Sequence, residues 1–297
     1  MARERMLLRE RTLLFGDAKS LVGIITEPAP SDEVQARPAV ILLNSGILHR
    51  VGPNRLHVRL ARRLAEAGFP VMRFDYSGIG DSRPRTDSAP FARSALAETR
   101  ECMDLLAASR RVRKFLLAGI CSGADSALSA GAQDDRVTGV ALIEPYAIPG
   151  PAFPLYQYRR QILDPRSWWR LLRGRSEILG SLRAHPAEPA PSDPPAAASA
   201  ALEPTPDFDS IVPSRGEFVR RVKGLVERGA GVCFVYSSES PAYFNYLVLL
   251  RREMRRPRAK GRVRVQVLKQ TDHVFTPLAV QDVLVETVRD WALTIGS

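Results

Sequence analysis

The sequence has few cysteines and no long apolar run. Its 297 residues include three cysteines, Cys102, Cys121 and Cys233. An odd and sparse set argues against a disulfide framework and for a reducing compartment. The start of the chain mixes Arg and Glu with short apolar pairs, unlike a signal peptide, and no apolar stretch is long enough to cross a bilayer. We therefore expect a cytoplasmic protein without a membrane span.

Acidic residues are scarce relative to basic ones. The chain has 43 Lys and Arg against 32 Asp and Glu, which gives a formal net charge of +11. Such a charge can attract nucleic acid, an anionic membrane or an acidic carrier. No nucleic-acid motif accompanies it, so we expect no nucleic-acid partner and assign most arginines to solvated helix faces. There is also no metal-ligand cluster and no phosphate-binding glycine loop, so we expect neither metal nor cofactor.

Apolar residues make up 45 % of the chain, enough for a sizeable core. Short apolar runs, typical of buried parallel strands, alternate with helical patterns. The predicted strands are residues 21–25, 39–43, 70–74, 114–118, 137–143, 231–236 and 262–268, with 11–15 forming a hairpin with the first. The predicted helices are 55–67, 95–108, 218–228, 243–254 and 280–293. This alternation predicts an α/β fold with a mostly parallel central sheet flanked by helices.

The alternation breaks between residues 149 and 213, which are rich in Pro and Ala. An insertion of this length is too long for a plain loop. We predict an α/β core formed by residues 1–148 and 214–297, with a lid insertion at 149–213. Within the lid, residues 184–206 are nearly low in complexity, which favours a flexible segment.

The strongest chemical signal is the run Gly119-Ile120-Cys121-Ser122-Gly123, between a predicted strand and a helical pattern. It matches the glycine–x–nucleophile–x–glycine elbow, with Cys where Ser is usual. Such a turn strains the nucleophile's backbone and requires small residues two positions away on each side. Cys121 would also lie at a helix N-terminus, where the dipole and free N–H groups favour a thiolate. We therefore predict that Cys121 is the nucleophile.

Four histidines are candidates for the general base, and His273 fits best. It follows the last predicted strand and comes after the nucleophile in the chain, as this architecture requires. His57 falls in a helical pattern and is expected at the surface, and His185 lies in the flexible segment. His49 follows the strand at 39–43 and lies nearer the expected pocket.

The third member of a triad is harder to assign. The usual acid follows the strand at 231–236, where Glu239 is the only carboxylate and Ser240 stands before Pro241. Glu239 is our first choice, and Glu144, directly after the strand at 137–143, is the main alternative. The remaining candidates are Asp125 and Asp272. A thiolate–imidazolium pair depends less on a third group than a Ser–His pair does.

Two backbone N–H groups are needed to hold the oxyanion of an acyl-transfer reaction. One is expected from Ser122 and the other from Gly46 or Ile47, in the loop after the strand at 39–43. Residues placed near the substrate pocket are Asn44, Ser45, Trp168 and Trp169.

Three segments together resemble the α/β-hydrolase superfamily over nearly the whole chain. They are the loop Asn44-Ser45-Gly46 with Gly52-Pro53-Asn54-Arg55, the run Phe74-Asp75-Tyr76-Ser77-Gly78-Ile79-Gly80-Asp81-Ser82, and the Cys121 elbow. Within the superfamily they look like the exosortase-associated and serine-aminopeptidase-like hydrolases. The cysteine is also similar to that of dienelactone hydrolases and cysteine-type thioesterases. Two departures are Asn44-Ser45 in place of the usual His-Gly, and the missing acid before Pro241.

The resemblance implies a cysteine-dependent acyl-enzyme hydrolase that acts on a thioester, ester or lactone. The substrate would be a small molecule or an acyl group carried by an acyl carrier protein or coenzyme A. One alternative is an acyltransferase or cyclase of a biosynthetic pathway that uses the same Cys121 and His273. Another is a catalytically inactive binding protein with the hydrolase fold.

Overall fold

The computed structural model describes residues 8–28, 37–110, 112–146, 211–238, 240–254 and 259–296. All of them belong to one compact unit, formed by residues 1–148 and 206–297. Residues 149–210 of the predicted lid, which include its flexible segment, Trp168 and Trp169, lie outside the described residues, as does Glu239.

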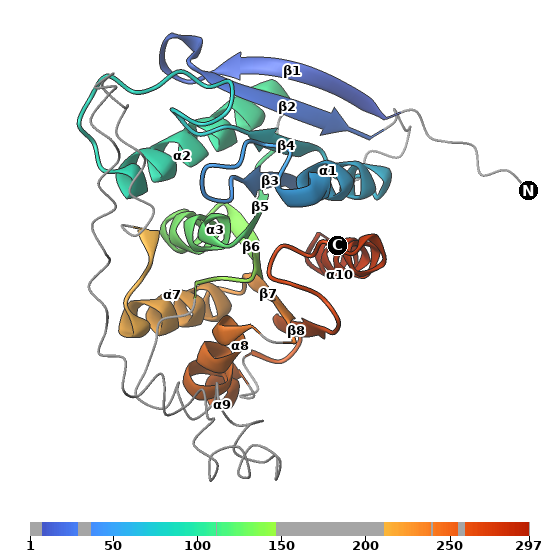
Figure 1. Ribbon diagram of the computed structural model, residues 1–297. Coiled ribbons are helices and arrows are strands. Elements are labelled where there is room, and N and C mark those ends of the chain that lie inside the picture. Colours follow the sequence, from blue (N-terminus) through green and yellow to red (C-terminus); the bar gives the residue numbers. More distant parts are fainter. Residues whose placement is uncertain are drawn as a thin grey trace, which may run out of the picture. The chain divides into compact units, whose positions relative to one another are not determined.

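An eight-stranded sheet forms the centre of this unit, with the order β1-β2-β4-β3-β5-β6-β7-β8 (Figure 1). Strand β2 runs antiparallel to β1 and β4, and the other neighbouring pairs are parallel. The strands are β1 Arg9–Phe15, β2 Leu21–Glu27, β3 Ala39–Leu43, β4 Val71–Phe74, β5 Phe115–Ile120, β6 Val137–Ile143, β7 Gly231–Ser237 and β8 Val263–Leu268. The predicted mostly parallel sheet is thus confirmed.

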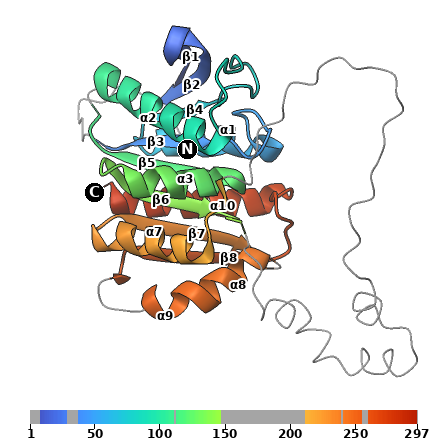
Figure 2. The ribbon, with the colours of Figure 1, turned by 90° about the vertical axis from the view of Figure 1, so that its left-hand side faces the viewer.

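Helices cover both faces of the sheet (Figures 1 and 2). The longer ones are α1 Leu56–Glu66, α2 Phe91–Arg110, α3 Ser122–Gln133, α7 Arg215–Glu227 and α10 Leu278–Ile295. The shorter ones are η1 Asp17–Lys19, η2 Pro53–Arg55, α8 Pro241–Asn245, η4 Tyr246–Leu250 and α9 Arg251–Met254. Helices α1 and α10 contribute to one apolar cluster, and α2, α3 and α7 to the other.

The two clusters explain why the central strands are apolar throughout. Successive side chains of a strand point to opposite faces, so Ile41 and Leu43 belong to one cluster and Leu42 to the other. Every residue of β3, β5 and β7 is buried, whereas the edge strand β1 is mostly exposed. Both faces of a parallel sheet need such cover.

The expected surface position of His57 is wrong. Its side chain lies in α1 with 1 % exposure, and its ring packs against Gly52, where an added Cβ would lie 2.6 Å from Cγ. Burial, with Arg73 nearby, lowers the pKa of His57 to about 4. The helical pattern of this segment did not show that the position faces the core.

Among the described residues, no helix is long and apolar enough to cross a membrane.

Candidate functional site

Cys121 lies in the turn between β5 and α3, at the carboxyl end of the sheet. Its backbone has φ 55° and ψ −126°, outside the regions that L-residues prefer. The residue is half-buried, unlike Cys102 and Cys233, which are fully buried. The strained turn therefore presents its thiol where a substrate can reach it.

The glycines around Cys121 are required by close backbone contacts. A Cβ at Gly119 would lie 2.2 Å from the carbonyl carbon of Gly123, and a Cβ at Gly123 would lie 2.5 Å from the carbonyl oxygen of Asn44. The second contact joins the elbow to the loop after β3. The turn thus fits only without side chains at these two positions.

His273 lies on the loop between β8 and α10, and its side chain is 52 % exposed. Its Nδ1 is 3.4 Å from Oε2 of Glu144. Hydrogen bonds with Cys121 and then with Glu144 raise the pKa of His273 to about 10, against the opposing effect of burial. The imidazole thus lies between the thiol and a carboxylate, and this position favours the protonated form of the imidazole.

The loop that carries His273 is held by its own contacts. The buried ring of Phe275 anchors it, and the carbonyl of Phe275 accepts a hydrogen bond of 2.9 Å from Nε2 of Gln281. Asp272 accepts hydrogen bonds from the backbone N–H of Thr276 at 2.9 Å and from its hydroxyl at 2.6 Å. Asp272 thus has a role in the loop itself.

Glu144 directly follows β6, and its side chain is 1 % exposed. It has a positive φ of 48°. Its two carboxylate oxygens accept hydrogen bonds from the backbone N–H of Ser237 and from the hydroxyl of Ser240. Ser237 is the last residue of the neighbouring strand β7, and Ser240 lies in the turn that follows it. The ends of two adjacent strands therefore hold the carboxylate beside His273.

Among the described residues, Glu144 therefore provides the carboxylate that contacts His273. Glu239, the first choice from the sequence, lies outside them. The positive φ of Glu144 and the donors from another strand have no signal in the linear sequence. Ser240, which stands where an Asp was expected, is one of those donors.

The loop after β3 approaches the elbow from the other side. The N–H of Gly46 donates a hydrogen bond of 2.7 Å to the hydroxyl of Ser122. The N–H of Ser122 is at the first position of α3, where it has no partner within the helix. Ile47 is 69 % exposed. The structure thus brings the predicted oxyanion residues Gly46 and Ser122 together.

Asn44 and Ser45 are both buried, with 2 % and 8 % exposure. The Asn44 amide donates to the carbonyl of Leu48 at 2.9 Å and to Asp75 at 3.3 Å. Its side-chain oxygen accepts from the backbone N–H of Tyr76 at 2.9 Å. This amide holds the loop in place, and its hydrogen-bonding groups are occupied within the fold.

A partly buried ionic network, to which the sequence assigned no role, fixes the same loop. Asp75 has no exposed surface and binds both the backbone N–H and the guanidinium of Arg50. The same guanidinium reaches Asp81 at 2.6 Å. The only sequence signal for this network is the run of residues 74–82, which resembles the hydrolase superfamily. That resemblance does not by itself show that Asp75 and Asp81 pair with Arg50.

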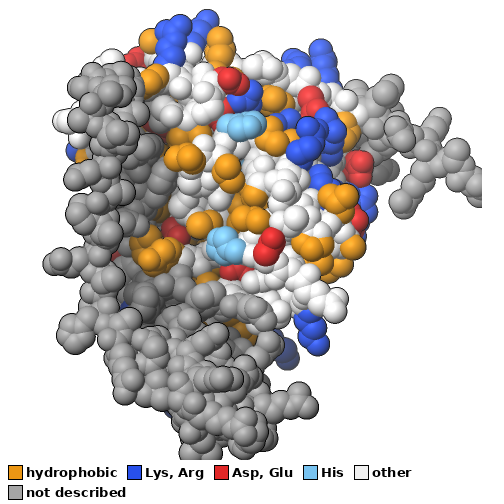
Figure 3. Space-filling model, viewed as in Figure 1, with side chains coloured by type: hydrophobic (Ala, Val, Ile, Leu, Met, Phe, Trp, Pro, Cys, Tyr) orange, Lys and Arg blue, Asp and Glu red, His pale blue; other side chains and the backbone are white. Residues whose placement is uncertain are grey.

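Apolar side chains surround this end of the sheet. Ile47, Leu48, Tyr146 and Leu278 have exposures of 69, 41, 47 and 66 %. They follow the carboxyl ends of β3, β6 and β8, where Cys121 also lies. Figure 3 shows hydrophobic side chains gathered between the histidines on one face. Several exposed apolar side chains therefore lie at the end of the sheet that carries Cys121.

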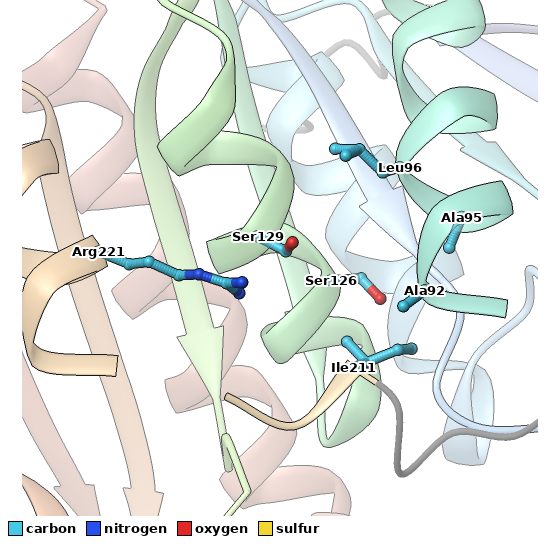
Figure 4. A pocket seen from close by; sticks show the side chains of 7 residues that line it. All are labelled: Ala92, Ala95, Leu96, Ser126, Ser129, Ile211 and Arg221. Atoms are coloured by element: carbon cyan, nitrogen blue, oxygen red, sulfur yellow. The ribbon is translucent and has the colours of Figure 1, made fainter. Parts of the chain in front are cut away.

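A pocket of about 60 Å³ lies elsewhere, between α2, α3 and α7 (Figure 4). It is lined by Ala92, Ala95, Leu96, Ser126, Ser129, Ile211 and Arg221. None of the elbow, histidine or acid residues belongs to it. Within the described part of the chain, no group of three His, Cys, Asp or Glu side chains is placed to hold a metal ion.

No protein-family model matches the chain, and no curated protein matches it either. Many solved structures are similar. One is a dienelactone hydrolase from Anabaena variabilis, with 12 % identity, a TM-score of 0.58, and coverage of 98 % of this chain and 99 % of that one. Another is Est1E from Butyrivibrio proteoclasticus with bound ferulic acid, with 17 % identity, a TM-score of 0.57, and coverage of 93 % and 95 %. A third is the hypothetical protein PA2218 from Pseudomonas aeruginosa, with 14 % identity, a TM-score of 0.63, and coverage of 97 % and 94 %. The chain thus has the α/β-hydrolase fold.

Proposed function

We propose that this protein is a hydrolase that forms an acyl-enzyme on Cys121. The observation that carries the proposal is one imidazole, His273, whose Nδ1 lies 3.4 Å from the buried Glu144 carboxylate and whose pKa is raised most by the elbow thiol of Cys121. Such an arrangement of nucleophile, base and orienting acid is the general geometry of covalent acyl transfer. The fold supports the class of enzyme, and the chemistry is argued from the site.

The reaction begins with the Cys121 proton on His273. The thiolate attacks the acyl carbonyl, forming the C–S bond while the carbonyl electron pair moves to oxygen. As the tetrahedral adduct collapses, the leaving alkoxide or thiolate takes the proton from His273. Neutral His273 then removes a proton from water, whose oxygen forms a bond to the acyl carbon. The C–S bond breaks, which releases the carboxylic acid and regenerates the Cys121 thiolate beside protonated His273.

Glu144 is the acid of this proposal, in place of Glu239. Its two hydrogen bonds, from Ser237 and Ser240, fix the carboxylate, and the carboxylate fixes the ring of His273. We expect Glu144→Gln to lower kcat about 10-fold or more, while Glu239→Gln leaves it near wild type. The reverse result would return the acid role to Glu239.

The exposed apolar side chains at this end of the sheet favour an aromatic or alkyl acyl group. Exposed Ile47, Leu48 and Leu278 offer hydrophobic contacts and no charge that would select a polar acyl group. Two similar structures are a dienelactone hydrolase and Est1E with bound ferulic acid, consistent with an ester or lactone substrate. Acyl thioesters of coenzyme A or an acyl carrier protein remain part of the proposal.

The test is intact-mass detection of an acyl adduct after mixing the protein with aromatic and alkyl esters and thioesters. We expect an adduct on wild type and none on Cys121→Ala. Cys102→Ser and Cys233→Ser are matched controls, because both thiols are buried and burial raises the pKa of each. An adduct of equal yield on Cys121→Ala would refute the proposal. Free acid as the only product indicates hydrolysis, whereas an amide or ester formed with an added nucleophile indicates an acyltransferase.

A further inference from the structure

The side chain of Ser122 occupies an unusual place beside the thiol. Its hydroxyl accepts the 2.7 Å hydrogen bond from the N–H of Gly46. That N–H is the group expected to bind the oxyanion, together with the N–H of Ser122 itself. The expected pair of backbone donors is therefore altered in this protein, because one of them already has a partner.

The Ser122 hydroxyl can also donate one hydrogen bond. A hydroxyl is a single donor as well as an acceptor. Within the part of the chain that the structure describes, Ser122 Oγ accepts a hydrogen bond from the N–H of Gly46 and donates to no acceptor. Hydrogen bonds in a chain polarise one another, so the bond from Gly46 makes the hydroxyl a better donor.

The position of Ser122 suits contact with the reacting carbonyl. It directly follows Cys121, is half-buried, and forms the first residue of α3. Its backbone N–H has no partner within the helix, and the helix dipole favours negative charge at this end. One residue thus offers two donors next to the sulfur, one from the backbone and one from the side chain.

We propose that the Ser122 hydroxyl, polarised by the Gly46 N–H, is a donor of the oxyanion hole. This rests on the proposed acyl-enzyme chemistry of Cys121. When the C–S bond forms and the carbonyl electron pair moves to oxygen, the hydroxyl and the N–H of Ser122 both donate hydrogen bonds to that oxygen. No proton is transferred in this contact, and the hydrogen bonds weaken again as the carbonyl re-forms.

The test compares two reactions of the same thiol in Ser122→Ala and Ser122→Thr. Acylation by an activated phenyl ester creates an oxyanion, whereas alkylation by iodoacetamide does not. We expect Ser122→Ala to lower the acylation rate constant about 100-fold, the usual effect of losing one oxyanion donor. Its alkylation rate constant should stay within about 3-fold of wild type, because alkylation creates no oxyanion for the hydroxyl to stabilise. Ser122→Thr keeps the hydroxyl and should recover most of the acylation rate that Ser122→Ala loses.

The outcomes separate this proposal from the one on which it rests. If wild type forms no adduct on Cys121, both proposals fall. If wild type is acylated and Ser122→Ala is acylated as fast or faster, only the hydroxyl role falls; a faster rate would mean that Ser122 blocks the Gly46 N–H. An equal loss in acylation and alkylation would assign Ser122 to the thiol's environment and also overturn the hydroxyl role.

Discussion

At the scale of single residues, His273 is defined by its neighbours. Its pKa is raised from 6.5 to about 10, with Cys121 as the larger cause and Glu144 as the next. Because the folded pKa lies above the unfolded one, the stability that this proton contributes is complete below pH 6.5. It is lost as the pH rises through about 10. At neutral pH the ring is therefore an imidazolium beside the thiol.

We predict that Cys121→Ala lowers the pKa of His273 the most and that Glu144→Gln lowers it by a smaller amount. Both changes remove a partner of the charged ring. The measurement is an NMR titration of the imidazole carbon-bound protons. Cys102→Ser should leave the His273 titration unchanged, since that buried thiol lies in α2. An unchanged pKa in Cys121→Ala would mean that the two side chains do not interact in solution.

The sequence led to Cys121 and His273 because both positions have local signals: flanking glycines for one, and the place after the last strand for the other. The acid had no such signal. Glu144 is selected by a positive φ at the end of β6 and by donors from a strand about ninety residues further along the chain. Contacts of this kind appear only when the sheet is assembled.

At the scale of elements, the elbow depends on β3, β5 and α3 meeting closely. A Cβ at Gly123 would lie 2.5 Å from the carbonyl oxygen of Asn44, and this obstructing atom belongs to the backbone. We predict that Gly123→Ala lowers the free energy of unfolding by about 1–3 kcal/mol, as overpacking does. It should also slow acylation strongly, because the loop that carries Gly46 must move away from Ser122. Chemical denaturation and the acylation assay measure the two effects.

Gly224→Ala in α7 is the matched control. That glycine is exposed, and an added Cβ meets nothing within 4 Å. Since Ala is the better helix former, this variant should gain about 0.5–1 kcal/mol and keep full activity. Equal stability of the two variants would show that the close approach at Gly123 is easily relieved.

Most elements followed from the sequence because their apolar patterns are strong. Strands β3 and β6 have the predicted bounds, and α10 extends the predicted helix by two residues at each end. The helix predicted over 243–254 differs. It begins at Pro241, with Ser240 as its N-cap, and is interrupted by the π-helical turn η4. A capping serine and a π turn do not change the apolar pattern from which the helix was predicted.

At the scale of the whole molecule, the positive charge is partly balanced by local pairs. On α1, Arg59, Arg62 and Arg63 pair with Asp282, Glu10 and Glu286. These exposed contacts each contribute little to stability. They do show that arginines on a helix face pair with carboxylates of neighbouring elements. The fold class followed from the sequence, but such pairings depend on how the elements pack.

Buried Asp125 gives the whole molecule a distinct pH dependence. It lies in α3 with 1 % exposure, and it accepts a hydrogen bond of 3.3 Å from the backbone N–H of Tyr146. Burial raises its pKa from 3.8 to about 7, although Tyr146 and Arg221 oppose the shift. Between these values the folded protein binds more protons than the unfolded chain, so this residue makes stability fall as the pH rises from about 4 to about 7.

We predict that Asp125→Asn removes this part of the pH dependence. The amide keeps an oxygen to accept from Tyr146 but carries no charge to bury, so the variant should be more stable than wild type at pH 8 by about 2–4 kcal/mol. The difference should shrink towards pH 4, where Asp125 is neutral in the folded protein. Urea denaturation at several pH values measures it, with Asp135→Asn as the control because that carboxylate is 98 % exposed. If Asp125→Asn and wild type lose stability in parallel as the pH rises, then the folded protein accommodates the charged carboxylate and the buried site is more polar than its packing indicates.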